Sequence, residues 1–391
     1  MFHVKHSRRP VWSGRRSLLA AAVLGLVGLA AAGCTGQLAE PEGWAAPVLA
    51  NGLVIVQERP GELVAVNIGD GVARDDRVVW RFPEDAVLPA GTDPDDIDLE
   101  AIYATPIVDG ADVYVAAYSG DVLALRLDVG ADEDQVRVRW LRRLSGHVVG
   151  TPAYDRAAGV LYVPTADGEL VPVGTANGEV GEPVARADAR LWSQPALDGS
   201  TIYVGGLDHR VRAIDRATQV ERWSERLGGA VAGDPVLDGE MLYVGALDRS
   251  IYALDLGADG AERWSFPGDG WFWARPLLRG EMLYAATVNG SVYALDTRRG
   301  EELWRFPGAD SEIRAQPVLV GGVLVVAARA GSLFGVDPAT GDQLWREDLL
   351  EGQLLADPLV LESAILYITN KGELIEVDPL SGATTTVFAR G

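Results

Sequence analysis

The sequence predicts an all-β fold, an eight-bladed β-propeller with four antiparallel strands in each blade. Three observations support this prediction. A motif that opens with proline occurs eight times, its period becomes nearly constant along the chain, and each copy alternates short apolar runs with turn residues. A period of about 40 residues with four strands per repeat is typical of propeller blades. Eight copies lie within the observed range of blade numbers.

The copy from Pro276 to Trp304 shows the repeating unit most clearly. Two apolar runs, 283–286 and 292–295, flank Asn289-Gly290. This dipeptide favours a tight hairpin turn because both residues tolerate positive φ. A second turn over 296–300 leads into a last run that ends at Trp304. We therefore expect each copy to form four antiparallel strands.

The other copies align on the same proline. The opening residues are Pro47, Pro106, Pro152, Pro195, Pro235, Pro276, Pro317 and Pro358. The first interval between them is the longest, and the last four are nearly equal, at about 40 residues each. Six copies end in a tryptophan: Trp80, Trp140, Trp223, Trp264, Trp304 and Trp345. The third and eighth copies lack it, and the third also replaces its Asp turn with Gly174 to Gly178.

The end of the seventh copy carries a known signature. Residues 336–345 read Val-Asp-Pro-Ala-Thr-Gly-Asp-Gln-Leu-Trp. This resembles the PQQ-type β-propeller repeat, in which an Ala-Leu-Asp triplet precedes Thr-Gly and then Trp. The resemblance covers residues 44–391 and implies a propeller. It does not by itself imply an activity, because function lies in sites grafted onto a fold.

The first 33 residues differ in composition from the rest of the chain. They carry five basic residues and no acidic ones, and 18–32 form an apolar run of fifteen residues. Such a run fits a signal peptide and is short for a membrane span. The run leads into Gly33-Cys34, which resembles a lipobox, so Cys34, the single cysteine, is the expected lipidation site. We expect a signal peptide at 1–33, a lipidated tether at 34–43 and the propeller at 44–391.

Both export routes remain open for this segment. Residues 14–19, Gly-Arg-Arg-Ser-Leu-Leu, resemble a twin-arginine signal, and a basic segment of an ordinary signal peptide accounts for the two arginines equally well. Either route places the mature chain outside the cytoplasm, anchored to a membrane by its lipid. That location is the periplasmic face of an outer membrane if the host has one, and the cell surface otherwise.

The charge of the chain narrows the choice of partners. The formal net charge is −22, and removal of the first 33 residues with their five basic groups takes it to −27. Such an acidic body would be repelled by a phosphate backbone, so we expect no nucleic-acid partner.

The residues before each proline give the candidate site. Two positions before it, all eight residues are small. One position before it, seven of eight are polar. We expect an innermost strand here, whose alternation turns the polar residues toward a central channel and the small ones toward crowded backbone. The candidate ligand- or partner-binding residues at one channel mouth are Trp192, Asp234, Trp271, Trp273, Arg275, Arg314 and Asp357. Aromatic, arginine and carboxylate groups suit a peptide or small ligand. In the structural alternative, the tryptophans seal the mouth and Arg275 pairs with Asp234 or Asp357.

Sequence features argue against catalysis. Quinoprotein dehydrogenases share these repeats, and that resemblance implies calcium held by Glu and Asn, an Asp base and often a cysteine pair near the quinone. No such set can be mapped here, and the mature chain keeps only His147 and His209. The insertion before the second copy holds five carboxylates over Asp93 to Glu100, without the order of a calcium loop, so an acidic solvated loop is expected. We expect neither PQQ nor calcium, and this insertion is a candidate partner-contact loop.

Together, the anchor, the acidic propeller and the missing catalytic set resemble the lipoprotein family of the outer-membrane β-barrel assembly machinery (BamB-type). That resemblance implies a non-catalytic scaffold that binds a β-barrel assembly channel through its blade loops. Two alternatives remain: a cell-surface propeller that binds a ligand at the channel mouth, and a quinone-dependent dehydrogenase-like protein.

Overall fold

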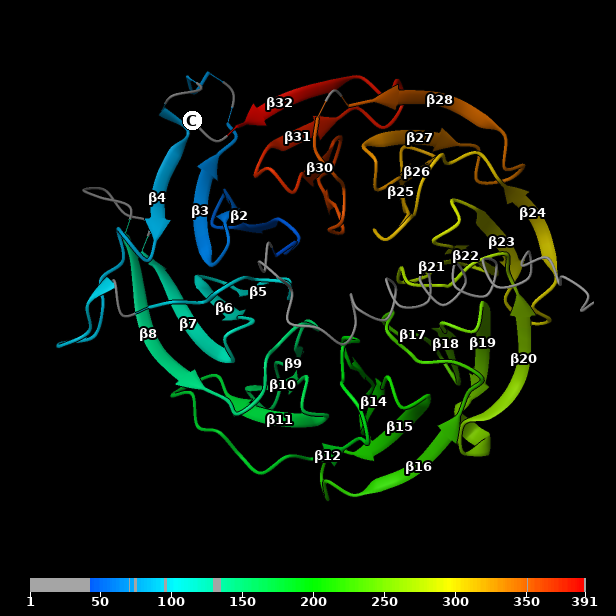
Figure 1. Cartoon of the computed structure of the whole chain (residues 1–391), viewed down its shortest axis with the longest axis horizontal. Helices are drawn as coiled ribbons and strands as arrows, with labels where there is room; N and C mark the ends of the chain where they lie inside the picture. Colours follow the sequence, from blue (N-terminus) through cyan, green and yellow to red (C-terminus); the bar gives the residue numbers. More distant parts are fainter. Residues whose placement is uncertain are drawn as a thin grey trace, which may run out of the picture. The chain divides into compact units, whose positions relative to one another are not determined.

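The computed structural model describes residues 43–389 except 70, 74–75, 95–96, 129–134 and 350. Within these residues, eight four-stranded antiparallel sheets follow one another along the chain, each built from consecutive strands. The sheets stand around a common axis as the blades of a propeller (Figure 1). The predicted all-β, eight-bladed fold is therefore confirmed.

The strand bounds follow the repeat. Blades one and two contain β1 (Val48–Ala50), β2 (Leu53–Arg59), β3 (Glu62–Asn67), β4 (Val78–Phe82), β5 (Ile107–Asp109), β6 (Asp112–Ala116), β7 (Asp121–Asp128) and β8 (Gln135–Arg143). Blades three and four contain β9 (Ala153–Asp155), β10 (Val160–Pro164), β11 (Glu169–Gly174), β12 (Ala185–Arg186), β13 (Ala196–Leu197), β14 (Thr201–Gly205), β15 (Arg210–Asp215) and β16 (Glu221–Arg226).

Blades five and six contain β17 (Val236–Asp238), β18 (Met241–Gly245), β19 (Ser250–Asp255), β20 (Ala261–Pro267), β21 (Leu277–Arg279), β22 (Met282–Ala286), β23 (Val292–Asp296) and β24 (Glu302–Phe306). Blades seven and eight contain β25 (Val318–Val320), β26 (Val323–Ala327), β27 (Ser332–Val336), β28 (Gln343–Asp348), β29 (Leu359–Val360), β30 (Ile365–Ile368), β31 (Leu374–Val377) and β32 (Thr384–Phe388). The third blade, with a two-residue β12, is as irregular as its sequence indicates.

The innermost strand of each blade begins after the opening proline, not before it. The predicted strand before the proline is wrong: residues 44–47 and 271–276, for example, belong to no sheet. The Asn289-Gly290 turn is present, but only Gly290 is left-handed (φ +84°). Its N–H donates to the Thr287 carbonyl at 3.0 Å.

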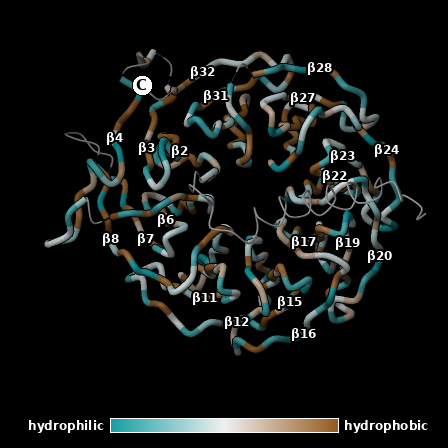
Figure 2. Tube along the Cα trace, viewed as in Figure 1, coloured by the Kyte–Doolittle hydropathy of each residue, from teal (hydrophilic) through white to brown (hydrophobic). Residues whose placement is uncertain are grey.

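Hydrophobic side chains fill the seams between the blades. Each of the eight buried clusters joins two successive blades, and hydrophobic stretches follow the strands in Figure 2. In β18, Leu242 and Val244 face blade four while Tyr243 faces blade six, because successive side chains of a strand point to opposite faces. The ring closes by the same packing, where Val54 and Val64 of blade one meet Leu366 and Leu374 of blade eight.

Four of the closing tryptophans fasten their outer strand to the next blade through a side-chain hydrogen bond. The Trp304 indole Nε1–H donates to the Pro338 carbonyl at 3.0 Å. Gly341 in the same turn is left-handed (φ +79°), and a Cβ there would lie 2.6 Å from the Trp304 ring. Equivalent bonds run from Trp140 to Thr175, Trp264 to Thr297 and Trp345 to Pro379. The signature Trp of one copy thus contacts the turn that carries the signature Gly of the next copy.

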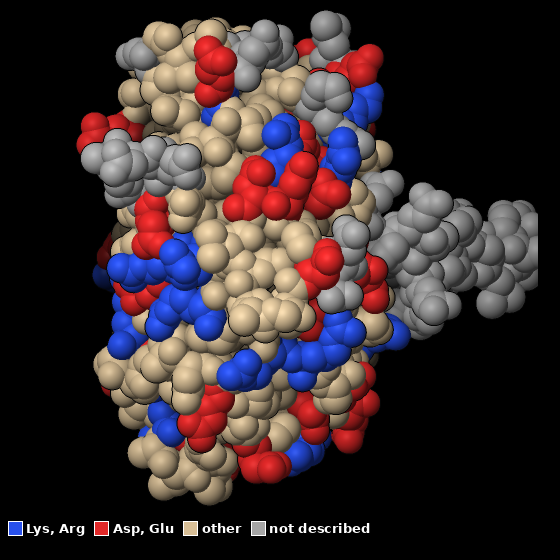
Figure 3. Space-filling model, turned by 90° about the vertical axis from the view of Figure 1, so that its left-hand side faces the viewer, with Lys and Arg blue, Asp and Glu red and all other residues tan. Residues whose placement is uncertain are grey.

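The insertion after β4 covers an edge of the second blade. Val87 forms a parallel bridge with Arg137 of β8, and Leu99 and Ile102 are buried in the first seam. Covering an exposed sheet edge prevents pairing with other chains. Asp95 and Asp96, part of the acidic run, lie outside the described residues. On this side of the propeller, basic and acidic side chains both lie on the surface (Figure 3). In the second blade, Arg126 and Arg139 both pair with Asp112.

Candidate functional site

A cavity of about 110 Å³ lies where eight segments converge, each of which leads to the opening proline of one blade. We call these segments the connectors. The residues three positions before each proline all line it: Trp44, Tyr103, Val149, Trp192, Ala232, Trp273, Arg314 and Leu355. Six of the residues one position before each proline also line it: Ala46, Thr105, Thr151, Asp234, Arg275 and Asp357. Gly150, Gly233 and Ala356, two positions before their prolines, line it as well, so the predicted alternation holds only in part, and the segment is not a sheet strand.

Backbone hydrogen bonds hold these segments in place. In seven blades, the turn between the second and third strands donates an N–H to the carbonyl five positions before the proline. Two examples are Val288 to Trp271 at 3.0 Å and Leu207 to Arg190 at 2.9 Å. Each of these connectors therefore enters the axis from a fixed point on its own blade.

The small residues two positions before each proline are crowded, as predicted. A Cβ on Gly150 would lie 2.4 Å from the carbonyl oxygen of Trp192, and a Cβ on Gly233 would lie 2.6 Å from that of Trp273. Ser193 is buried and donates its hydroxyl to the Gly205 carbonyl at 2.9 Å. Larger side chains here would push neighbouring connectors apart.

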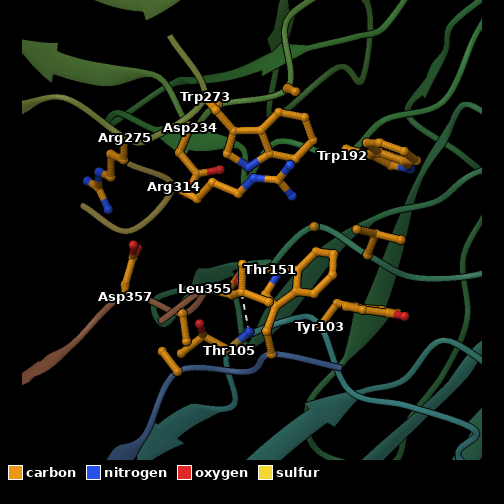
Figure 4. Close-up of a pocket in the computed structure, with 17 residues that line it drawn as sticks. Tyr103, Thr105, Thr151, Trp192, Asp234, Trp273, Arg275, Arg314, Leu355 and Asp357 are labelled. Carbon is orange, nitrogen blue, oxygen red and sulfur yellow. Dashed lines mark hydrogen bonds between the residues drawn. The ribbon is translucent and has the colours of Figure 1, made fainter. Parts of the chain in front are cut away.

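Two carboxylates on the axis bridge neighbouring blades. Asp234 Oδ1 accepts a hydrogen bond from the Gln194 backbone N–H at 2.6 Å, and Asp357 Oδ1 accepts one from the Gln316 N–H at 2.6 Å. Thr151 plays the same part for the Thr105 N–H at 2.9 Å (Figure 4). The sequence shows these residues at one repeat position but does not reveal that each side chain serves the preceding blade.

Burial raises the pKa of both carboxyls. Desolvation raises the pKa of Asp234 to about 6, since it outweighs the Gln194 hydrogen bond, and the charge of Asp357 adds to the rise. Desolvation likewise raises the pKa of Asp357, against the opposing effects of Gln316 and Arg275. The Arg275 charge lowers the pKa of both groups, but less than burial raises it.

Arg275 does not form the ion pair expected in the structural alternative. It has no described carboxylate partner within 4.0 Å, and its Nε is buried without a hydrogen-bond partner. The Trp192 Nε1 is also buried without a partner. Two donors at the cavity are thus left unsatisfied by the described residues, which is costly unless a ligand or solvent accepts from them.

The aromatic wall is built around Trp273. Its ring centroid lies 6.4 Å from that of Trp192, and the Arg314 guanidinium carbon lies 5.2 Å from the Trp273 centroid. Arg314 Nε also contacts Glu312 at 2.8 Å, so this cation is both stacked and paired. Trp44 and Tyr103 form the opposite wall, with ring centroids 4.3 Å apart.

Trp271 is the one predicted mouth residue on a described connector that does not line the cavity. It lies five positions before Pro276, where its carbonyl anchors the connector, and 36% of its surface is exposed. Trp271 therefore lies outside the cavity, and we call this exposed part of the connectors the rim. Cys34 lies outside the described residues.

The remaining candidates carry no site of their own. His209 occupies a turn in a left-handed conformation (φ +67°), and His147 Nδ1 lies 2.6 Å from the Tyr118 carbonyl oxygen. Among the described residues, no group of three His, Cys, Asp or Glu side chains is placed to hold a metal ion. The same residues include no helix of the length and hydrophobicity needed to cross a membrane.

Fold and site together define an eight-bladed propeller whose connectors line a small axial cavity. The family model described as "Outer membrane protein assembly factor BamB" matches residues 35–180, 176–270, 256–315 and 288–385. The chain therefore belongs to this family, and the resemblance seen in its repeats is confirmed.

Individual relatives are more distant. The outer membrane protein assembly factor BamB of Alkalilimnicola ehrlichii is 30% identical over 171 residues, which span 42% of this chain and 37% of that protein. The aligned region thus covers little more than a third of that relative.

Two solved structures share the fold. BamB from Moraxella catarrhalis has a TM-score of 0.67 at 18% identity, covering 87% of this chain and 96% of that one. The computationally designed Ika8 protein also has a TM-score of 0.67, at 15% identity, covering 86% and 97%. At such identities the likeness shows the fold alone.

Proposed function

We propose that this protein is a non-catalytic, extracytoplasmic scaffold that binds protein partners in outer-membrane assembly, among them a β-barrel assembly channel. The observation that carries the proposal is the family match over residues 35–385. The partner is inferred from what that family's name describes, and the geometry below indicates which surface would receive it.

The face of the propeller around the cavity suits this role. The connectors and the turns between second and third strands all lie on this face, because strands alternate in direction within each blade. We call it the connector face. Its loops are fastened to each other by the repeated turn-to-connector hydrogen bonds. Rigidly supported loops lose little conformational entropy on binding, which favours their use in recognition.

Trp271 is the best-placed contact residue on the connector face. It is a large aromatic side chain with 36% of its surface exposed, on a connector whose backbone is held by Val288. Tryptophan is enriched among residues that dominate protein–protein binding energy. The insertion runs from the edge of β8, where Val87 pairs with Arg137, to the connector face, where the Ser119 N–H donates to the Leu99 carbonyl, and it remains a second candidate contact.

Lipidation at Cys34 would keep the scaffold at a membrane. The basic segment, the apolar run and the Gly33-Cys34 junction support this part of the proposal. In this arrangement the anchor supplies location, while the connector face supplies recognition.

The size of the axial cavity supports a role without a quinone. Its volume of about 110 Å³ is below the range of roughly 300–1,000 Å³ typical of pockets for drug-sized ligands. Asp234 and Asp357 each use one carboxylate oxygen to hold a neighbouring blade, which gives them a structural task.

Affinity purification of the Cys34-anchored protein from native membranes, followed by mass spectrometry, tests the proposal. Enrichment of a β-barrel assembly channel over an unrelated lipoprotein control supports it. Absence of any such channel would favour the cell-surface alternative, in which the propeller binds a ligand at its mouth.

A further inference from the structure

We infer that the connector face binds an acidic protein segment through a basic arc on blades four and five, formed by Arg210, Arg226 and Arg249. This inference rests on the proposed scaffold function. It adds the chemistry of the partner and the part of the face that the partner contacts.

Two turns on the connector face carry a side chain where the other blades have glycine. The left-handed position of the turn between the second and third strands is glycine in six blades, whereas blade four has His209 (φ +67°) and blade five has Arg249 (φ +74°). A Cβ at one of these glycines, Gly290, would lie 2.4 Å from the Ala309 carbonyl oxygen. Left-handed backbone is unfavourable for residues other than glycine, and such residues gather at functional sites. Blade five therefore holds a cation at a position where the fold favours glycine.

Two arginines face each other at the connector end of blade four. Arg210 begins β15 and is the direct partner of Arg226, which ends β16. Side chains at opposite positions of an antiparallel pair lie on the same face of the sheet, where like charges destabilise the pairing. A bound anion between them would remove that repulsion.

Carboxylates of the described chain do not neutralise these cations. None among the described residues lies within 4.0 Å of the Arg210, Arg226 or Arg249 guanidinium. Arg210 instead donates to the Ser224 hydroxyl at 3.1 Å. Arg226 and Arg249 are exposed, and Arg210 is half-buried. The arc is therefore open to an external anion.

The carboxylates nearest along the chain have other partners or directions. Asp208 forms an ion pair with Arg212, and Asp248 accepts a hydrogen bond from the Tyr252 hydroxyl at 2.5 Å. Glu225 directly precedes an arginine of the arc and therefore points to the opposite face of β16. The arc thus keeps its positive charge, although the chain as a whole is strongly acidic.

Backbone contacts bring the arc together as one surface. The Leu227 N–H donates to the His209 carbonyl at 2.8 Å, which fixes the end of β16 beside the turn of blade four. The next residue, Gly228, lies against the turn of blade five, since a Cβ there would lie 2.2 Å from Asp248 Oδ2. Arg249 follows in that turn, and blades four and five are neighbours in the ring (Figure 1). The arc therefore spans two blades without a break.

A short segment rich in glutamate or aspartate fits the arc. Guanidinium groups bind carboxylates through paired hydrogen bonds, which are stronger than bonds between neutral groups. An extended anionic surface, such as a membrane, would also face the rest of the chain, whose net charge of −22 would repel it. A segment of a few residues meets only the arc.

Fluorescence anisotropy with the purified full-length protein tests the inference. The probe is a short labelled peptide in which glutamate alternates with serine, and the matched probe has glutamine in place of glutamate. We expect saturable binding of the glutamate peptide, at least tenfold weaker binding of the glutamine peptide, and a loss of affinity as salt is added. Failure of the glutamate peptide to bind, or equal binding of both peptides, would overturn the inference.

Two variants locate the site. Arg226→Gln and Arg249→Gly should each weaken binding of the glutamate peptide at least threefold. Arg249→Gly also restores the glycine of the other blades, so its thermal unfolding midpoint should not fall, which separates lost binding from lost folding. Arg279→Gln removes an exposed arginine at the end of β21, on the opposite face of the propeller, and as the matched control should leave affinity unchanged. Unchanged affinity in both arc variants would contradict the assignment.

Vesicles of phosphatidylglycerol distinguish a membrane from a protein segment. Because a lipid anchor would itself insert into vesicles, the comparison is between the wild type and Arg226→Gln. Equal vesicle binding by the two is expected. Vesicle binding that is lost in the variant, with no peptide binding by the wild type, would assign the arc to a membrane instead.

The peptide titration and the affinity purification fail independently. If the glutamate peptide does not bind while the wild type still recovers the assembly channel from native membranes, the arc alone is overturned. Absence of the channel from the purification would contradict the scaffold function, whatever the peptide does.

Discussion

Asp234 Oδ1 accepts the Gln194 backbone N–H at 2.6 Å, so a carboxylate of blade five holds the connector of blade four. The same side chain lines the axial cavity, where burial raises its pKa to about 6. Asp234 thus joins two blades and also lines the axial cavity.

The pKa of Asp234 predicts how its substitution depends on pH. The carboxyl titrates at about 3.9 in an unfolded chain, and its pKa is about 6 in the folded one. The folded chain therefore binds this proton more tightly, so the contribution of Asp234 to stability is largest below pH 4 and is lost as the pH rises through 6. Asp234→Asn has no such proton. From pH 4 to pH 7.5, the unfolding free energy should shift by about 2 kcal/mol in favour of the variant.

Urea unfolding at a series of pH values measures that shift. Asp259→Asn, at an exposed turn position, controls for the loss of one charge. A difference between wild type and Asp234→Asn that stays constant over this range would show that burial does not perturb the carboxyl.

The tryptophan contact between blades predicts a contrast between two glycines. Gly341 and Gly280 both have positive φ, at +79° and +57°, but only a Cβ at Gly341 meets an indole ring. Gly280→Ala should cost about 1–2 kcal/mol of unfolding free energy for its backbone conformation. Gly341→Ala should cost roughly 1–3 kcal/mol more, because it also forces Trp304 out of place. Equal thermal unfolding midpoints for Gly280→Ala and Gly341→Ala would show that the contact between Gly341 and Trp304 does not constrain this position.

The connector face predicts opposite outcomes for two nearby tryptophans. Trp271 lies on the rim, and Trp273 lies in the cavity. Trp271→Ala should reduce recovery of the protein partner at least tenfold, a loss of about 1.4 kcal/mol or more in binding free energy. Trp273→Ala should leave recovery nearly unchanged. Quantitative mass spectrometry after affinity purification compares them, and a large loss with Trp273→Ala alone would place recognition in the cavity instead.

Lipidation predicts where the protein is found after fractionation. Cys34→Ser removes the thiol that would be acylated, so the protein should lose incorporation of labelled fatty acid and its membrane association. The Cys34→Ala variant should behave in the same way. Labelling that persists in both variants would mean that Cys34 is not the lipidated residue.

The repeat explains why so much of the fold can be predicted from the sequence. Eight prolines at a nearly constant period and six closing tryptophans predict the blades, because each copy must pack on the next in the same way. The alternation before each proline also predicts which side chains meet at the axis. What it misses is the position of the innermost strand: Pro276 precedes β21, whereas the connector before that proline was expected to be the strand.

Features that depend on two blades at once are not predictable from one repeat. The bond from Gln194 to Asp234 joins residues forty positions apart, and no local pattern distinguishes it from a pairing of Asp234 with Arg275. Trp271 and Trp273 lie two positions apart, so alternation alone predicts that both face the cavity. Trp271 instead lies at the rim, where its carbonyl accepts the Val288 N–H. Spacing predicts which side a residue faces, and the connector geometry determines how far along the axis it lies.

Photo-crosslinking in living cells tests the central claim most directly. A photoreactive phenylalanine analogue at Trp271 probes the connector face. The same analogue at Leu303, which is 53% exposed on the outer strand β24, probes the perimeter. The account predicts a crosslink to a β-barrel assembly channel from position 271 and none from 303. Crosslinks to that channel from 303 alone, or from neither position in a protein that remains membrane-bound, would contradict it.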